Sequence, residues 1–389
     1  MRGCTQCGEC LNVCPVFRQH WREEFSPKGK RLLLEPVNAG IEIEGFTWDE
    51  IFALARLCAG CGRCQQACAR KLSTADLLAD VRARHPHWTQ RFWELWINHM
   101  GPLWPAVGFF AGLASQGLMP KALESSLATA KSLVNRKNIS PWVRFFPGDA
   151  PQDPSPVVLF PGCTARNVRS QWTEKAESLL WTCGYTLLDG NGFTCCGGTM
   201  HHAGQYAAMT AIRRVNLEVW ERMGRPRIAT FCASCLHGLM EYADGFLEGE
   251  DARVWKKSLT PLTALLDGLR SEVLAAKPAT YGYHQPCHWA VDRDMPFLGG
   301  KVPGLLKGDG ICCGMGGILK MTDPDLSASM AKTCLRGMPE GVENILTGCS
   351  GCAMQLSAFA PEGVVVLHWL DAICSADKQF IRGTGPSPV

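Results

Sequence analysis

The chain has 389 residues, 46% of them hydrophobic, which is enough for two or three domains with their own cores. Its formal charge is +3, and its basic residues form no continuous stripe along the sequence, which argues against nucleic acid as a partner. The 21 cysteines occur in pairs and clusters along a long chain, whereas the disulfide frameworks of secreted proteins are usually short. Free thiols in this number predict a reducing compartment.

The N-terminal region carries eight cysteines in two runs of identical spacing. The runs are Cys4, Cys7, Cys10 and Cys14, and Cys58, Cys61, Cys64 and Cys68. Thiolates hold iron, and this spacing matches the bacterial ferredoxin pattern, in which the fourth cysteine of each run ligates the other cluster. We therefore expect a ferredoxin-type domain with two [4Fe–4S] cubanes over residues 1–86.

The crossed pattern predicts the ligands of each cubane. One set is Cys4, Cys7, Cys10 and Cys68, and the other is Cys58, Cys61, Cys64 and Cys14. The alternative metal is zinc, which usually takes two Cys-x-x-Cys units in a closed shell and fits these runs poorly. Pro15 follows the first run, but Ala69 stands in the corresponding place of the second, so we expect a local change in that turn.

The chain changes character after the second run. Lys71–His85 predicts a helix, because Ser73 and Asp76 have the spacing of a capping box. Residues 87–150 form a connector without cysteine, and its tryptophans include Trp88, Trp93, Trp96 and Trp104. The stretch between Leu95 and Met119 has no Asp, Glu, Lys or Arg, but prolines and glycines interrupt it, so it is a poor membrane span.

Three interpretations of this helical connector remain open. It forms a pair of short helices buried between domains, or a docking surface for a partner subunit, or a peripheral membrane contact through tryptophan. Residues 148–156 (GDAPQDPSP) are a linker by composition.

An internal repeat occupies residues 156–389. Each copy opens on a short apolar strand that ends at a cysteine, continues to a Cys-Cys-Gly triplet, and closes on a strand that runs into Cys-x-x-Cys. In both copies 35 residues separate the second cysteine of the triplet from the final pair. Helical stretches such as Ser170–Cys183 and Gln205–Met223 lie between the strands, so we expect an α/β layer in each copy, over residues 151–275 and 276–389.

Each repeat supplies five cysteines that we expect to hold an iron–sulfur cluster. They are Cys163, Cys195, Cys196, Cys232 and Cys235 in the first copy, and Cys287, Cys312, Cys313, Cys349 and Cys352 in the second. Glycines after the triplets allow close backbone approach to a cluster, and we expect four of them beside it: Gly197, Gly198, Gly314 and Gly316. The alternative is that one copy holds zinc or nothing.

Histidines near these cysteines are candidate proton donors, since imidazole titrates near neutral pH. His202 and His288 are the two we select, although packing against a loop or hydrogen bonding to a cluster sulfur explains them equally well. The remaining cysteines, Cys183, Cys334 and Cys374, are expected to be buried structural thiols. No Rossmann fingerprint or P-loop is present, so we expect no flavin or nucleotide in this chain.

With these motifs, almost the whole chain resembles the D-type subunits of heterodisulfide reductase, in which a two-cluster ferredoxin domain is fused to a two-repeat cysteine-rich CCG domain. It is also similar to the iron–sulfur subunits of anaerobic glycerol-3-phosphate dehydrogenase and glycolate oxidase, and residues 26–34 (SPKGKRLLL) resemble the SPRGR-type stretch of the latter. The resemblance implies an α+β and α/β fold, with a helical ferredoxin-type domain followed by two pseudo-symmetric α/β CCG repeats.

The resemblance also implies function. In heterodisulfide reductase five such cysteines hold a noncubane [4Fe–4S] cluster, and both units here keep all five, so one or two noncubane clusters are expected to carry thiol/disulfide chemistry. The expected protein is an oxidoreductase subunit of a membrane-associated complex of anaerobic respiration. The alternative is a pure electron conduit between a dehydrogenase or cytochrome subunit and the quinone pool.

The same likeness implies partners and location. The expected partners are a membrane cytochrome b-like or quinone-interacting subunit, a cytochrome c or flavoprotein subunit, and a small thiol or disulfide as substrate. No signal peptide precedes Cys4, the first expected ligand, so we expect a cytoplasmic protein on the cytoplasmic face of the inner membrane.

Overall fold

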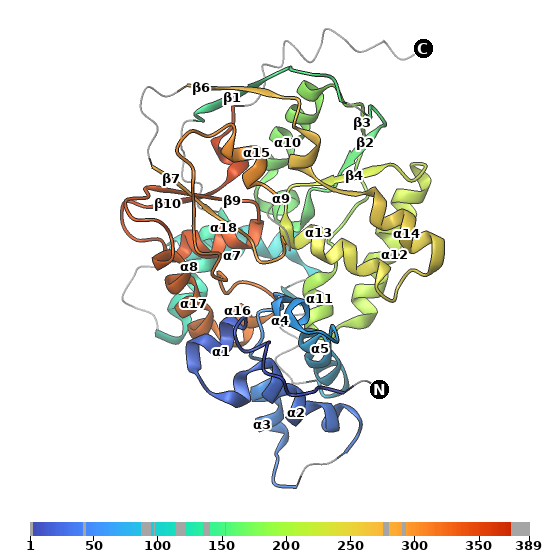
Figure 1. Ribbon diagram of the computed structural model, residues 1–389, viewed down its shortest axis with the longest axis vertical. Coiled ribbons are helices and arrows are strands. Elements are labelled where there is room, and N and C mark those ends of the chain that lie inside the picture. The colour runs from blue at the N-terminus through green and yellow to red at the C-terminus, as the bar shows by residue number, and fades with distance from the viewer. Residues whose placement is uncertain are drawn as a thin grey trace.

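The computed structural model describes residues 3–41, 44–86, 95–96, 98–113, 121–134, 141–151, 153–274, 280–289 and 293–374. A small helical module built from the N-terminal residues lies at one end of the molecule, and the two α/β repeats make up the rest (Figure 1). The expected order of a ferredoxin-type domain followed by two CCG repeats is confirmed.

The N-terminal module consists of short helices between the cysteine-bearing loops. They are α1 (Pro15–His20), α2 (Pro27–Asn38), α3 (Trp48–Ala55), α4 (Arg63–Ala67) and α5 (Thr74–Arg84), with a 3-10 turn at Glu23–Phe25. The predicted helix at Lys71–His85 is present as α5, and Ser73 Oγ accepts the Asp76 N–H at 3.2 Å, which satisfies a backbone donor that the first turn leaves unpaired. The fully buried Leu34 and Leu78 join α2 and α5 in one core.

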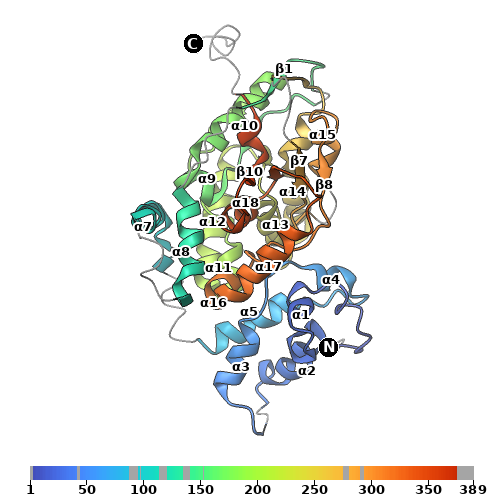
Figure 2. The same cartoon turned by 90° about the vertical axis from the view of Figure 1, so that its left-hand side faces the viewer.

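Two helices of the connector pack against the repeats, the earlier one against the first repeat and the later one against the second. They are α7 (Met100–Leu113) and α8 (Lys121–Val134), and α8 lies between α7 and the helices α17 (Pro324–Arg336) and α18 (Ser350–Phe359) (Figure 2). The prolines were expected to interrupt this stretch, but α7 is continuous. Pro102 falls in the first turn, where its missing N–H costs nothing, and the helix continues through Pro105.

The connector is only partly covered by the rest of the protein. Phe109 and Phe110 on α7 are 61% and 67% exposed. Within the described ranges no helix has the length and hydropathy required to cross a bilayer. Trp88 and Trp93 lie outside the described residues.

The two repeats contain four-stranded parallel sheets of the same topology. The first sheet has the order β3-β2-β4-β5, made by β2 (Val157–Leu159), β3 (Leu187–Leu188), β4 (Arg227–Thr230) and β5 (Leu259–Pro261). The second has the order β8-β7-β9-β10, made by β7 (Tyr281–His284), β8 (Leu306–Lys307), β9 (Asn344–Thr347) and β10 (Val365–His368).

Helices connect the strands of each sheet, as parallel pairing requires. In the first repeat they are α9 (Gly162–Val168), α10 (Ser170–Cys183), α11 (Gly198–Ala203), α12 (Tyr206–Arg222), α13 (Ala233–Met240) and α14 (Gly249–Ser258). In the second they are α15 (Met295–Gly299), α16 (Leu319–Thr322), α17 and α18. Short strands end shortly before cysteines in both repeats, so these cysteines gather at the carboxyl ends of the strands.

An antiparallel ribbon, not foreseen from the sequence, ties the connector to the segment between the repeats. Strand β1 (Val143–Phe146) pairs with β6 (Arg270–Val273), with Val143 opposite Val273. Both repeats contribute to one hydrophobic core, in which Trp172 and Trp369 are fully buried. The repeats therefore form one body rather than two separate units.

The N-terminal module docks on both repeats through glycine backbone. A Cβ at Gly316, after the second triplet, would overlap the carbonyl oxygen of Ala59, and a Cβ at Gly60 would come within 2.7 Å of His202 Nε2. The buried Arg82 guanidinium donates to the carbonyls of His202 and Ala55, so it joins α5 to the first repeat. Burial lowers the Arg82 pKa to about 10, which leaves the side chain charged at neutral pH.

This docking contact is testable through Gly316. We expect Gly316→Ala to lower the free energy of unfolding by about 1–3 kcal/mol, because the added methyl group has no room against Ala59. Gly300→Ala is the matched control, since a Cβ there meets only the Phe297 carbonyl at 4.0 Å. Urea denaturation of the reconstituted proteins measures both, and equal midpoints for the two variants would contradict the tight docking.

Candidate functional site

Two small cavities in the N-terminal module are lined by the two crossed cysteine sets. Cys4, Cys7, Cys10 and Cys68 line a cavity of about 40 Å³, and Cys14, Cys58, Cys61 and Cys64 line one of about 30 Å³. Cys64 also borders the first cavity, so the two lie side by side. The structure thus brings together the same cysteines that the ferredoxin spacing assigns to each of the two sets.

A buried lysine lies beside the second cavity. Lys30 belongs to the SPKGK segment on α2, where the Ser26 hydroxyl caps the helix by accepting the Gly29 N–H at 2.9 Å. The Lys30 ammonium lines the cavity and donates to the Leu57 carbonyl. Burial lowers the Lys30 pKa, and thiolate charge at Cys58 and Cys14 acts against that shift. Sequence reasoning singled out the segment but not this role.

The ten cysteines of the two repeats form one continuous row of sulfurs. Each side chain interacts with the next, in the order Cys163, Cys195, Cys196, Cys235, Cys232, Cys349, Cys352, Cys313, Cys312, Cys287. The sulfurs of Cys313 and Cys352 are 3.2 Å apart. All members are buried except the two ends of the row, which are partly exposed.

Hydrogen bonds between neighbouring thiols shift their pKa values in opposite directions at several places in the row, although the pKa values of Cys349, Cys352 and Cys313 are all raised. Hydrogen bonds from Cys195 and Cys235 hold the pKa values of Cys196 and Cys232 well below their usual range, and those of the two donors are raised. A hydrogen bond from Cys287 likewise lowers the pKa of Cys312. Ten contacting sulfurs cannot all carry negative charge unless positive charge lies among them.

The row crosses from one repeat to the other at Cys232 and Cys349. The Ser350 N–H donates to the Cys232 sulfur at 3.4 Å, and the Ser234 hydroxyl lies 3.0 Å from the Cys349 sulfur. The Ala233 N–H also donates to the Gly348 carbonyl at 2.9 Å. Each repeat therefore contacts a cysteine that belongs to the other.

The four glycines selected from the sequence all lie close to these cysteines or to the module. Gly197 and Gly314 share a φ of +81°, a conformation that strongly favours glycine, and Gly198 lies beside the Cys196 sulfur. Two further glycines were missed: a Cβ at Gly162 would lie 2.5 Å from the Cys235 sulfur, and one at Gly238 would lie 2.8 Å from the Cys196 sulfur.

The two selected histidines lie where the module meets the repeats. Burial lowers the His202 pKa to about 3, so its ring is neutral at physiological pH and cannot act there as an acid. His288 contacts the Gly60 carbonyl through Nε2 at 3.0 Å and the Ser234 hydroxyl through Nδ1 at 3.2 Å. Its ring stacks on His237, with centroids 4.3 Å apart. His288 thus touches the module and both repeats.

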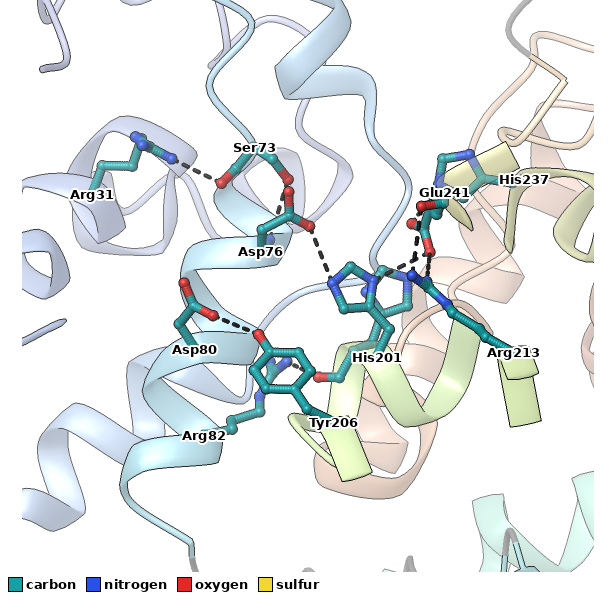
Figure 3. Close-up of polar contacts among 11 residues, drawn as sticks. Arg31, Ser73, Asp76, Asp80, Arg82, His201, Tyr206, Arg213, His237 and Glu241 are labelled. Atoms are coloured by element: carbon teal, nitrogen blue, oxygen red, sulfur yellow. Dashed lines mark hydrogen bonds and ion pairs between the residues drawn. The ribbon is translucent and has the colours of Figure 1, made fainter. Parts of the chain in front are cut away.

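A polar network centred on Glu241, which sequence reasoning missed, surrounds this junction (Figure 3). Glu241 takes contacts from His201 Nδ1 at 3.2 Å, the Arg213 guanidinium at 3.3 Å and His237 Nε2 at 3.4 Å. His201 Nε2 reaches Asp76 of α5 at 3.6 Å, so the network spans the module and the first repeat. Only the fold brings these residues together, because they come from α5, α11, α12 and α13 and the turn after α13.

The three remaining cysteines lie away from the cavities of the module. Cys183 and Cys334 are buried, and the Cys183 thiol lies 3.2 Å from the Leu265 carbonyl, which it can only reach as a donor. Cys374 is partly exposed rather than buried, because it follows the last described 3-10 turn at the edge of the fold.

Two known domains match the chain over the regions just described. A 4Fe-4S dicluster domain matches residues 1–72, and a cysteine-rich domain named CCG matches twice, over residues 157–240 and 281–357. Clusters of iron and sulfur are thereby supported as the cofactors.

The whole chain is also similar to curated proteins at modest identity. The glycolate oxidase iron-sulfur subunit of Escherichia coli (strain K12) is 22% identical over 396 residues, which cover 96% of this chain and 93% of that protein. The D subunit of the dihydromethanophenazine:CoB--CoM heterodisulfide reductase of Methanosarcina acetivorans is 24% identical over 393 residues, which cover 91% and 87%. The probable glycolate oxidase iron-sulfur subunit of Bacillus subtilis (strain 168) is 22% identical over 397 residues, 91% and 87% of the two chains.

The ferredoxin-type cavities, the duplicated CCG repeats and these full-length likenesses agree with one another. The chain belongs to the family of iron–sulfur proteins that join a 4Fe-4S dicluster domain to two CCG domains, as the D subunit of heterodisulfide reductase and the iron–sulfur subunit of glycolate oxidase do.

Proposed function

We propose that this protein is an electron-transferring subunit of an oxidoreductase complex and that thiol/disulfide chemistry takes place where its two repeats meet. The observation that carries the proposal is the continuous row of ten sulfurs, which crosses between the repeats at Cys232 and Cys349. Relatives named as heterodisulfide reductase and glycolate oxidase subunits support the assignment to an oxidoreductase complex.

The proposed ligand sets follow the cavities and the row. The crossed sets of the module hold two [4Fe–4S] cubanes, and the five cysteines of each repeat hold a noncubane [4Fe–4S] cluster. The donor chemistry fits, because soft thiolates in buried cavities favour iron–sulfur groups. When bound, these groups supply one-electron steps; the protein holds them, excludes water and fixes their spacing.

Electrons pass between the module and the second repeat in this proposal. Burial raises the pKa of Cys61 in the module, and Cys312 lies close enough for its thiolate charge to raise it further. Gly316 brings the loop after the second triplet against Ala59, and Arg63 donates to the Gly310 carbonyl across the same boundary. Backbone atoms form much of this contact, so the separation between the two centres is fixed.

The reaction at the repeats consumes one disulfide, two electrons and two protons and releases two thiols, or runs in reverse. Two centres on opposite sides of one sulfur–sulfur bond can each deliver one electron to one of the two sulfurs. His288 is the candidate that orients groups at this boundary, since it contacts the Ser234 hydroxyl beside Cys349.

The second candidate function is a pure conduit that carries electrons from a dehydrogenase or cytochrome subunit to the quinone pool. The exposed Phe109 and Phe110 on the uncharged helix α7 favour a surface that meets another subunit or a membrane. In either function the proposed partners are a membrane cytochrome b-like or quinone-interacting subunit and a cytochrome c or flavoprotein subunit, and the proposed location is the cytoplasmic face of the inner membrane.

Iron content tests the ligand sets. We expect about sixteen irons in the fully loaded chain, four for each of four clusters, and a loss of about four from either Cys14→Ser or Cys68→Ser, because each removes one cubane ligand. Cys183→Ser is the control: it is a buried cysteine outside all four sets, and serine keeps the donor to Leu265. Iron analysis with absorption spectroscopy gives the count, and full iron in both ligand variants would overturn the crossed ligation.

A thiol titration separates catalysis from conduction. We expect the anaerobically reconstituted wild-type chain to develop an EPR signal when it is oxidised in the presence of a thiol, and not in its absence. Cys196→Ser and Cys313→Ser should abolish that signal while both cubanes remain reducible by dithionite. If both variants keep the thiol-dependent signal, or if electron transfer through the assembled complex is intact in both, the repeats are not the reactive site.

A further inference from the structure

A histidine in the second repeat lies among the sulfurs of that repeat. His284 ends strand β7, three positions before Cys287, and its side chain is 2% exposed. One of its ring nitrogens and the sulfurs of Cys313 and Cys352 all lie within 4.8 Å of one another. In the described part of the chain this is the one cluster of three such groups close enough to bind a single metal ion.

The hydrogen bonds around His284 determine which ring nitrogen carries the proton. The Cys334 sulfur lies 3.2 Å from the Ile311 carbonyl and 3.3 Å from His284 Nδ1. A carbonyl only accepts, so the single thiol proton of Cys334 points to Ile311, and Nδ1–H of His284 must donate to the sulfur. The other nitrogen, Nε2, therefore has a free lone pair.

That lone pair has no protein partner. His284 Nε2 is buried and accepts no hydrogen bond from any described residue. Leaving a buried acceptor unpaired is costly, so such atoms usually have an additional partner. An imidazole nitrogen beside two thiolates is a suitable ligand for iron.

We propose that Nε2 of His284 ligates the iron of the centre that Cys313 and Cys352 hold in the second repeat. The proposal rests on the proposed function, since it requires an iron–sulfur centre in that repeat. The Nδ1–H bond to Cys334 would hold the ring in the ligating tautomer, as such bonds commonly do for metal-bound histidine. Cys334 thereby acts as a positioning residue rather than an inert thiol.

The first repeat has no counterpart of this ligand. Phe160 occupies the equivalent position directly after β2, three residues before Cys163, and it is fully buried against Phe193. The five cysteines of each repeat are retained, so imidazole would be an additional ligand in the second repeat only, and the ligand set is one of the factors that determine the reduction potential of an iron–sulfur centre. The centre of the second repeat, next to Cys61 of the module, would then differ from that of the first in its ligands and in its reduction potential.

A second buried histidine provides a matched control. His368 at the end of β10 is also fully buried, and its Nε2 also lacks a partner among the described residues. Its Nδ1, however, accepts the Leu370 N–H at 3.3 Å, so the proton is on Nε2 and that nitrogen cannot ligate a metal. The two histidines share burial and repeat but differ in tautomer.

Pulsed EPR of the reconstituted full chain tests the ligand directly. The chain is prepared with natural-abundance and with ¹⁵N-labelled histidine and poised where the second-repeat centre is paramagnetic; that centre is identified as the signal lost in Cys313→Ser. We expect a directly bonded histidine nitrogen in the wild-type chain, its loss in His284→Phe, which installs the residue of the first repeat, and its retention in His368→Phe. The wild-type measurement stands even where a variant fails to fold.

The potential gives an independent readout. In His284→Phe we expect the midpoint potential of the centre to shift by the equivalent of about tenfold in its reduction equilibrium, ~59 mV for one electron, and in His368→Phe we expect it to stay unchanged. If the loaded wild-type centre shows no bonded histidine nitrogen, the role of His284 is overturned and the proposed function still stands. The same holds if the centre of the His284→Phe variant keeps the coupling to a histidine nitrogen. Unchanged iron content in Cys313→Ser overturns both, because the second repeat then holds no centre.

Discussion

The structure depends on the burial of closely spaced sulfur. Thiolates repel one another at contact distance in a low-dielectric interior, and hydrogen bonds between thiols of the first repeat lower the pKa values of Cys196 and Cys232 and raise those of Cys195 and Cys235. Cations relieve it further. The buried Lys30 near one cavity reduces the repulsion between thiolates, and iron bound to the thiolates would reduce it in the same way.

The fold meets this constraint with short parallel strands, tight glycine turns and backbone-to-backbone docking. Strands of three or four residues end just before cysteines, so sulfurs of distant segments reach one place without long loops. Glycines at Gly162, Gly238 and Gly316 remove the Cβ atoms that would otherwise occupy the space of sulfur or of a neighbouring carbonyl. Spacing between centres is thus determined by main chain, which changes little with surface mutation.

Local patterns in the sequence were sufficient to predict much of the fold and of the cysteine groups. The cysteine spacing predicted the two groups of the module, the repeat predicted two sheets of one topology, and Ser170–Cys183 was foreseen to the residue. What could not be foreseen came from contacts between distant segments: the Glu241 network, the crossing at Cys232 and Cys349, and the environment of His284. The sequence also did not show that helix α7 would continue through Pro105, which lies inside it, although the same stretch was correctly judged a poor membrane span.

The crossing between the repeats also shows how the two copies differ. Ser350 donates to Cys232 while Ser234 lies against Cys349, so each copy completes the surroundings of a sulfur that belongs to its twin. The two contacts are not symmetric, however: Cys232 and Cys349 are equivalent positions of the repeat, but Ser350 corresponds to Ala233 and Ser234 corresponds to Gly351. The duplicated copies therefore differ at their boundary as well as at Phe160 and His284, so the surroundings of each sulfur are specific to its own copy.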